Sequence, residues 1–187
     1  MEISLPPVAC RTVLVIGAAR SGKSRYALGL AEATAADRVY LATAEAGDAE
    51  MAERIARHRS ERGAGWRTRE EPLELAAALR AEARPERVVL VDCLTLWLSN
   101  LMLAGRDIEA QISELTNVLS DPSGPVALIA NEVGAGVVPA TPLGRVFRDW
   151  QGRLNQQAAA ACDAVVAVAA GLPAQLKPAP RPDIQLR

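Results

Sequence analysis

The sequence has few aromatic residues, a single histidine and three cysteines. Aromatic residues make up 3% of the 187 residues and hydrophobic residues 50%, so the core must consist mainly of Ala, Val, Leu and Ile side chains. The cysteines, Cys10, Cys93 and Cys162, lie far apart and show no CxxC spacing. This pattern argues against a disulfide framework and a structural zinc site, and it predicts a reducing compartment.

The chain also lacks an excess of one charge and any long hydrophobic segment. Its formal net charge of -1 gives no global attraction to nucleic acid or to anionic membranes, so an anion site must be local. No stretch reaches the ~18 uninterrupted apolar residues that a membrane span requires, and the N-terminal segment 1–17 has no basic start typical of a signal peptide. These absences predict a cytoplasmic protein with no nucleic-acid partner and no membrane span.

Short, continuous apolar segments alternate along the chain with helical patterns. Continuous Val-rich runs are typical of strands buried on both faces, and they occupy residues 12–17, 38–43, 87–92, 125–130 and 163–170. Helical patterns cover residues 23–36, 71–83, 94–105, 107–121 and 143–161. The alternation predicts one α/β domain over residues 1–187, with a mostly parallel sheet covered by helices.

Both ends of the chain are expected to lie outside this core. Residues 1–11 form an N-terminal extension ahead of the first predicted strand. Residues 172–187 contain four prolines and are predicted to be extended or loose, with 178–187 as a Pro-rich tail.

The segment GAARSGKS, residues 17–24, matches the pattern GxxxxGK[ST]. A predicted strand leads into it and a predicted helix follows it, which is the context that a P-loop requires. Gly17 and Gly22 allow a tight backbone whose amides point at phosphate. Lys23 can reach the β- and γ-phosphates, and the Ser24 hydroxyl can bind Mg²⁺. The context argues against a chance match, and it predicts a nucleoside triphosphate site in a P-loop NTPase (RecA-like) architecture.

Two further groups follow predicted strands. Asp92 ends the strand 87–92, where an acidic residue commonly holds Mg²⁺ beside a P-loop, although it can also cap the next helix. Ligands gather at the carboxyl ends of such strands, which favours the metal. Asn131 and Glu132 end the next strand, and they either face a ligand or form a turn before Gly134.

The only histidine, His58, stands among arginines, which are Arg54, Arg57, Arg59 and Arg62. Nearby cations depress the pKa of an imidazole, so His58 is expected to stay neutral at physiological pH and able to attack an anion.

The segment around His58, residues 48–63, has a helical pattern with Asp48 as a plausible cap. Met51, Ile55 and His58 share one apolar stripe. The spacing alone therefore also fits a half-buried structural histidine near a helix C-terminus, and the arginines also fit a solvated face.

Six segments carry a more specific signal, in the order GAARSGKSRYAL, YLATA, MAERIARHRSERGAGWRTREEP, LVDCLTLWLSNL, NEVGAGVVP and FRDWQGRLNQQAAAACDAVVAVAAGLP. In this order they resemble the bifunctional adenosylcobinamide kinase / adenosylcobinamide-phosphate guanylyltransferase family. The resemblance extends from residue 13 to about residue 177. It implies an enzyme that phosphorylates adenosylcobinamide with a nucleoside triphosphate. The enzyme then transfers GMP from GTP through a guanylyl-histidine to give adenosylcobinamide-GDP in cobalamin biosynthesis.

The resemblance also implies roles for individual residues. His58 would carry the GMP, and Lys23 would act with it in catalysis. Ser24 and Asp92 would hold Mg²⁺, with GTP as the nucleotide and ATP as an alternative phosphate donor. The implied nucleotide-binding residues are Gly17, Ala18, Ala19, Arg20, Ser21, Gly22, Lys23, Ser24, Ala42, Thr43, Ala44, Arg59, Ser60, Glu61, Arg62, Glu70 and Asp92.

Two positions depart from the family pattern without removing a functional group. Ala18 stands where a second glycine is common, and Gly63 stands where proline often follows the basic run. The resemblance implies a homo-oligomer, for which a trimer is one option, and Trp97 in an apolar helix is a candidate for the interface. Two rival interpretations stay open: a small-molecule kinase in which His58 is structural, and a P-loop module that binds nucleotide without turnover.

Overall fold

The structure, a computed structural model, describes residues 9–44, 62–63 and 65–179. Within this part, seven strands form one sheet in the order β3-β2-β4-β5-β1-β6-β7. All neighbouring strands pair in parallel except β7, which is antiparallel to β6. The strands are β1 (Thr12–Gly17), β2 (Asp37–Ala42), β3 (Trp66–Glu70), β4 (Arg87–Asp92), β5 (Val126–Asn131), β6 (Ala164–Ala169) and β7 (Leu172–Lys177).

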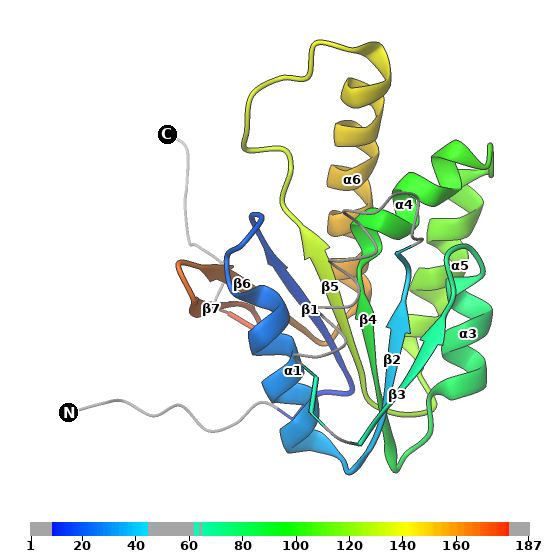
Figure 1. Cartoon of the computed structure of the whole chain (residues 1–187), viewed down its shortest axis with the longest axis vertical. Coiled ribbons are helices and arrows are strands. Elements are labelled where there is room, and N and C mark those ends of the chain that lie inside the picture. The colour runs from blue at the N-terminus through cyan, green and yellow to red at the C-terminus, as the bar shows by residue number, and fades with distance from the viewer. Residues whose placement is uncertain (1–8, 45–61, 64, 180–187) are drawn as a thin grey trace, which may run out of the picture.

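The helices cover both faces of this sheet (Figure 1). Alternate strand residues point to opposite faces. Val13 and Val15 of β1 pack with Ala27 of α1, whereas Leu14 packs with the other helices. The helices are α1 (Lys23–Thr34), α3 (Leu75–Glu82), α4 (Leu94–Leu103), α5 (Ile108–Ser120) and α6 (Pro142–Ala161). The predicted α/β class and the P-loop context of strand, loop and helix are confirmed.

All five predicted strands form, each within one residue of its predicted ends. The helix predicted over 71–83 begins later, at Leu75. The cause is local: the Glu71 carboxylate accepts hydrogen bonds from the backbone amides of Leu73 and Glu74, at 3.5 and 3.0 Å. A side chain that bonds to nearby backbone in this way offers an alternative to a helical turn.

Two edge strands were not predicted. β3 has the sequence WRTRE, and its charged residues hide the strand from a search for apolar runs. β7 lies in the segment predicted to be extended or loose, and it is extended but paired with β6. Ala170 and Gly171 adopt φ of 51° and 80°, the left-handed backbone of a tight hairpin turn, so the chain reverses directly into β7.

β7 is also fixed at its far end. The Lys177 ammonium donates hydrogen bonds to the carbonyls of Ala159, Ala160 and Cys162 at the end of α6. These carbonyls have no partner inside the helix, so a cation there satisfies them and complements the negative end of the helix dipole.

Trp97 of α4 was predicted to be available for an interface, and this prediction is wrong. Its side chain is fully buried and belongs to the core cluster that also contains residues of α3, α5 and α6. Its indole Nε1 donates a hydrogen bond to the Leu73 carbonyl at 2.8 Å, as a buried tryptophan requires. Trp97 therefore packs the core. Among the described residues, no helix combines the length and the apolarity of a membrane span.

Candidate active site

The P-loop joins the end of β1 to the start of α1 and depends on two glycines. A Cβ at Gly17 would lie 2.5 Å from the Val168 carbonyl oxygen and 2.6 Å from the Ser21 Oγ, so no larger residue fits there. Gly22 adopts a φ of 96°, which favours glycine. The sequence GAARSGKS thus folds into the tight loop that its glycines predict.

The interior of this loop is suited to an anion. Lys23 is 8% exposed, and its Nζ donates a hydrogen bond to the Ala18 carbonyl at 3.1 Å, so the ammonium lies over the loop. The Ser21 Oγ is buried without a hydrogen-bond partner among the described residues. The N-cap of α1 is Gly22, with no side-chain cap, which leaves the first amides of the helix to a ligand. These groups fit a bound phosphate chain.

The carboxyl ends of the parallel strands bring further predicted residues to the same edge of the sheet. Glu70, Ala42 and Asp92 are register partners across β3, β2 and β4. Gly17, where the P-loop begins, ends β1 at this edge. Ligands of open α/β sheets bind outside these strand ends. We call this edge the carboxyl rim, made of the P-loop (17–24), residues 42–44, Glu70 and Asp92.

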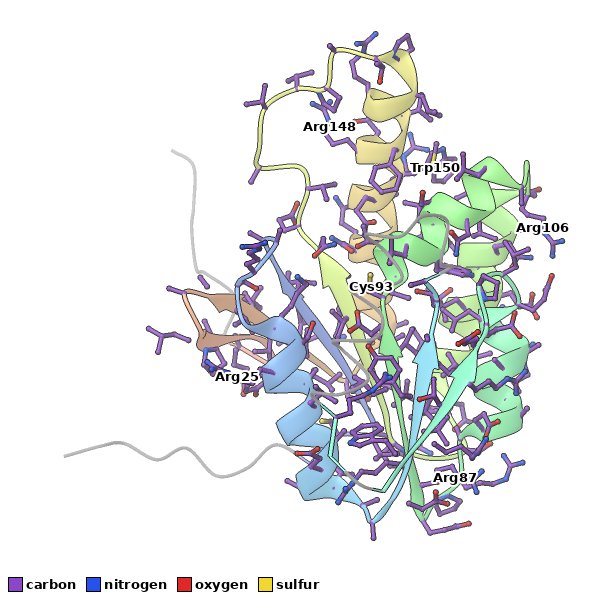
Figure 2. All side chains as sticks on the ribbon, in the orientation of Figure 1. Arg25, Arg87, Cys93, Arg106, Arg148 and Trp150 are labelled. Carbon is purple, nitrogen blue, oxygen red and sulfur yellow. The ribbon has the colours of Figure 1, made fainter. Side chains whose placement is uncertain are left out.

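The charges of Asp92 and of the P-loop lysine both influence the thiol of Cys93, the residue that follows β4. Burial raises the pKa of the Cys93 thiol to about 11, the negative charge of Asp92 adds to this effect, and the positive charge of Lys23 opposes it. Both charges therefore act on one buried atom. In Figure 2, Cys93 directly follows β4 and marks the carboxyl end of this strand, whereas Arg87 marks its other end.

The alternative role of Asp92 as a helix cap is wrong. The N-cap of α4 is Cys93, and it has no side-chain cap hydrogen bond. The Asp92 Oδ2 instead accepts a hydrogen bond from the Tyr40 hydroxyl at 2.7 Å. The carboxylate of Asp92 and the hydroxyl of Ser24 are oxygen ligands of the kind that Mg²⁺ takes beside substrate phosphates. Among the described residues, no group of three or more His, Cys, Asp or Glu side chains could hold a metal ion.

Thr43 reaches the rim, but its hydroxyl faces the protein. Its Oγ1 donates to the Cys93 carbonyl and accepts from the Cys93 amide, both at 2.8 Å. Its carbonyl accepts a hydrogen bond from the Asn100 Nδ2 at 2.7 Å. Thr43 therefore fastens the end of β2 to the turn that carries Asp92, while its neighbours Ala42 and Ala44 complete the end of the strand.

Two described residues near the site escaped the sequence analysis. Tyr40 lies within a predicted strand, and the signal that could have identified it is a hydroxyl within an apolar run. A buried tyrosine usually finds a polar partner, which here is Asp92. Asn100, a polar residue in an apolar helix, gave a similar signal and bonds to the carbonyls of Thr43 and Pro72.

Arg62 is the first described residue after the segment that carries the histidine. Its guanidinium carbon lies 3.5 Å from the centroid of the Tyr40 ring, and the residue is 9% exposed. Trp66 packs edge-on against the same tyrosine, with the two ring centroids 6.2 Å apart. Predicted residues His58, Arg59, Ser60 and Glu61, with the predicted helix 48–63 up to residue 61, lie outside the described residues.

For Asn131 and Glu132, the structure favours the turn over the other alternative. The Glu132 Oε1 accepts a hydrogen bond from the Gly134 amide at 3.0 Å. The Glu132 amide donates to the Gly17 carbonyl at 3.0 Å, which ties this turn to the start of the P-loop. The backbone of Asn131 is held by Thr95 and Asn155. A role in binding ligand stays a prediction.

Comparison with known proteins places this geometry in context. Residues 13–176 match the model of a family described as cobinamide kinase / cobinamide phosphate guanyltransferase. The bifunctional adenosylcobalamin biosynthesis protein CobP of Pseudomonas aeruginosa is 48% identical over 169 residues, covering 89% of this chain and 98% of that protein. The corresponding protein CobU of Escherichia coli is 39% identical over 180 residues, covering 88% and 99%.

Among solved structures, the match with one ATPase domain covers 84% of this chain and 68% of the other. Its TM-score is 0.41 and its sequence identity 16%, a likeness too low to bear on function.

Proposed function

The chain belongs to the cobinamide kinase / cobinamide phosphate guanyltransferase family, and from this membership we propose that it performs both reactions at the carboxyl rim. It phosphorylates a hydroxyl of adenosylcobinamide with a nucleoside triphosphate. It then transfers GMP from GTP to the new phosphate. The product is adenosylcobinamide-GDP, a step in cobalamin biosynthesis. GTP is the proposed nucleotide, with ATP as an alternative phosphate donor.

In the kinase step, the hydroxyl oxygen of adenosylcobinamide attacks the γ-phosphorus in line. A new P–O bond forms, the bond between the γ-phosphorus and its bridging oxygen breaks, the nucleoside diphosphate leaves, and the hydroxyl proton is released. Lys23 and the P-loop amides hold the β- and γ-phosphates and neutralise their charge. Ser24 and Asp92 would hold Mg²⁺, which when bound neutralises the same oxygens.

In the second step, a neutral imidazole nitrogen of His58 attacks the α-phosphorus of GTP and pyrophosphate leaves. A phosphate oxygen of adenosylcobinamide phosphate then attacks the same phosphorus, the P–N bond breaks, and His58 returns to its starting state. Arg59 and Arg62 would neutralise the charge that develops in both attacks, and Ser60 and Glu61 would help hold GTP. The position of Arg62 against Tyr40, next to Asp92, supports a role at the rim.

The observation that carries the proposal is the P-loop itself: the Lys23 Nζ lies over the loop, the buried Ser21 Oγ has no hydrogen-bond partner among the described residues, and Asp92 ends β4 at the same edge of the sheet. A P-loop lysine and a carboxylate at one edge of the sheet suit phosphoryl transfer. The two rival interpretations predict different group transfers. A simple kinase transfers the γ-phosphate but no GMP, and a nucleotide-binding module transfers neither the γ-phosphate nor GMP.

A double-label experiment tests the proposal. The protein is incubated with adenosylcobinamide and Mg²⁺, and with GTP labelled at either the γ- or the α-phosphorus. We expect the γ-label to enter adenosylcobinamide phosphate and the α-label to enter adenosylcobinamide-GDP, with Lys23→Ala as the inactive control. Transfer of the γ-label alone would favour the simple kinase, and transfer of neither would favour the binding module.

The assembly and location of the protein belong to the same proposal. The resemblance favours a homo-oligomer such as a trimer, and we propose a cytoplasmic location from the composition of the sequence. With Trp97 buried, the exposed apolar side chains of Val137, Leu143 and Val146, around the start of α6, are better candidates for a contact. Light scattering of the purified protein measures the assembly, and a monomeric mass at micromolar concentration would contradict it.

A further inference from the structure

Tyr40 lies between two parts of the proposed active site that the sequence separates. It belongs to β2, the strand between β3 and β4 (Figure 1). Its hydroxyl donates to the Asp92 Oδ2 at 2.7 Å, and the guanidinium of Arg62 lies 3.5 Å from the centroid of its ring. One 5% exposed side chain thus contacts the proposed metal carboxylate and the first described residue after the segment that carries His58.

The hydroxyl contact constrains Asp92. A carboxylate on a short side chain can rotate about its terminal bond, and such rotation is broad when nothing holds it. A 2.7 Å hydrogen bond to Oδ2 fixes that rotation and assigns one oxygen to Tyr40.

The ring contact constrains Arg62. A guanidinium over an aromatic face gains electrostatic energy, more so where water is excluded, and Arg62 is 9% exposed. Trp66 meets Tyr40 edge-on at an interplanar angle of 85°, which holds the ring from a second direction. The ring is thus a fixed platform for the arginine.

We propose that Tyr40 is a positioning residue with two separable roles. Its hydroxyl orients the Asp92 carboxylate toward the metal–phosphate complex of the kinase step. Its ring holds Arg62 in place for guanylyl transfer. The inference rests on the proposed function of the carboxyl rim, and it extends that function by coupling the two half-reactions through one side chain.

The hydroxyl role is tested with Tyr40→Phe, which keeps the ring. The readout is Mn²⁺ binding in the presence of a non-hydrolysable GTP analogue, followed by electron paramagnetic resonance. We expect the half-saturating Mn²⁺ concentration to rise roughly tenfold, the size expected for losing a hydrogen bond to a charged group. The control is Tyr26→Phe on α1, which changes the only other tyrosine and is expected to match wild type.

A double-variant comparison separates positioning from a general structural effect. If Tyr40 acts through Asp92, Tyr40→Phe should change Mn²⁺ binding little in an Asp92→Asn background. Equal fold-changes in both backgrounds, or wild-type binding by Tyr40→Phe alone, would overturn the hydroxyl role. If the wild-type protein itself binds no Mn²⁺ with the analogue, the metal site of the proposed function fails instead.

The ring role is tested by the rate at which protein retains label from α-labelled GTP in a single turnover. Tyr40→Leu should slow labelling about tenfold more than Tyr40→Phe, because only the leucine variant loses the platform under Arg62. Arg62→Lys keeps the charge but not the planar contact. It should slow labelling when introduced into the wild-type protein, and have little further effect when combined with Tyr40→Leu. If Tyr40→Leu fails to fold, Arg62→Lys alone tests the ring role.

If the wild-type protein is labelled and Arg62→Lys is labelled at the same rate, the ring role is overturned. Absence of label from the wild type would instead remove the guanylyl-histidine step of the proposed function.

Discussion

At the scale of single residues, Lys23 is the positive charge on which the P-loop depends. It is nearly buried and lies over the loop, where its Nζ bonds to the Ala18 carbonyl. We expect Lys23→Ala to weaken GTP binding and to lower the rate of adenosylcobinamide phosphorylation by roughly a hundredfold or more, since one lost electrostatic contact in a transition state costs about that much. Calorimetric GTP affinity and a γ-label assay, both close to wild type, would refute the P-loop assignment.

Asp92→Asn keeps the shape of the side chain and removes its charge. The amide oxygen can still accept from the Tyr40 hydroxyl, so the fold should change little in stability. The Mg²⁺ concentration needed for half-maximal kinase activity should rise, with a lower maximal rate, because a neutral oxygen is a weaker ligand for a hard cation. A Mg²⁺ titration of the kinase step measures both. An unaltered Mg²⁺ requirement would exclude Asp92 as a metal ligand.

At this scale the sequence predicted the loop residues well and the supporting contacts poorly. Gly17, Gly22 and Lys23 follow from a motif whose spacing encodes their roles. The bonds of Thr43 to Cys93 and of Tyr40 to Asp92 join residues 50 and 52 positions apart, and only strand pairing in the folded sheet brings them together. No local pattern carries that information.

At the scale of elements, α3 holds the edge strand β3 through one carboxylate. Glu82, at the end of α3, forms ion pairs with Arg67 and Arg69 of β3 and with Arg87 of β4. Hydrogen bonds from Arg67 lower the pKa of Glu82 from 4.5 to about 2, with Arg69 adding to the effect and burial opposing it. Arg87 lies at the end of β4 far from Cys93 (Figure 2), so this cluster is remote from the candidate site.

A lowered pKa in the folded state makes this contribution pH-dependent. The stabilisation is fully present above the unfolded pKa near 4.5 and is lost as the pH falls toward 2. At pH 7 we expect Glu82→Gln to lower the free energy of unfolding by about 1–2 kcal/mol, a value reduced by the solvent exposure of Arg67. Urea unfolding of both proteins at pH 7 and near pH 2.5 measures it. The difference should narrow at the lower pH, and a difference independent of pH would contradict the role of the ion pairs.

Element prediction succeeded where burial dictates composition. β1, β4 and β5 lie inside the sheet, so both faces are apolar and their runs of Val, Leu and Ile identify them. β3 and β7 lie at the two edges, where one side meets solvent and charged residues or proline are tolerated. Their pairing depends on neighbouring strands, and for this reason local composition did not reveal them.

At the scale of the whole molecule, parallel strands gather distant residues at one edge. The P-loop, Ala42, Glu70 and Asp92 come from four segments of the chain, and the carboxyl ends of β1, β2, β3 and β4 bring them together. The family is described by two reactions, those of a cobinamide kinase and of a cobinamide phosphate guanyltransferase, and both need a bound triphosphate. We propose that one bound triphosphate serves both reactions, with its γ-phosphorus open to one nucleophile and its α-phosphorus to another.

We propose that His58 carries GMP between the two substrates. The measurement is the retention of label by denatured protein after incubation with α-labelled GTP and Mg²⁺, for wild type and His58→Ala. Wild type should retain label that acid releases and base does not, as a phosphoramidate does. The alanine variant should retain none and still convert adenosylcobinamide to its phosphate, because direct in-line transfer needs no protein nucleophile. Equal labelling of the two proteins would contradict the claim, and since the chain has no second histidine, it would exclude a histidine carrier altogether.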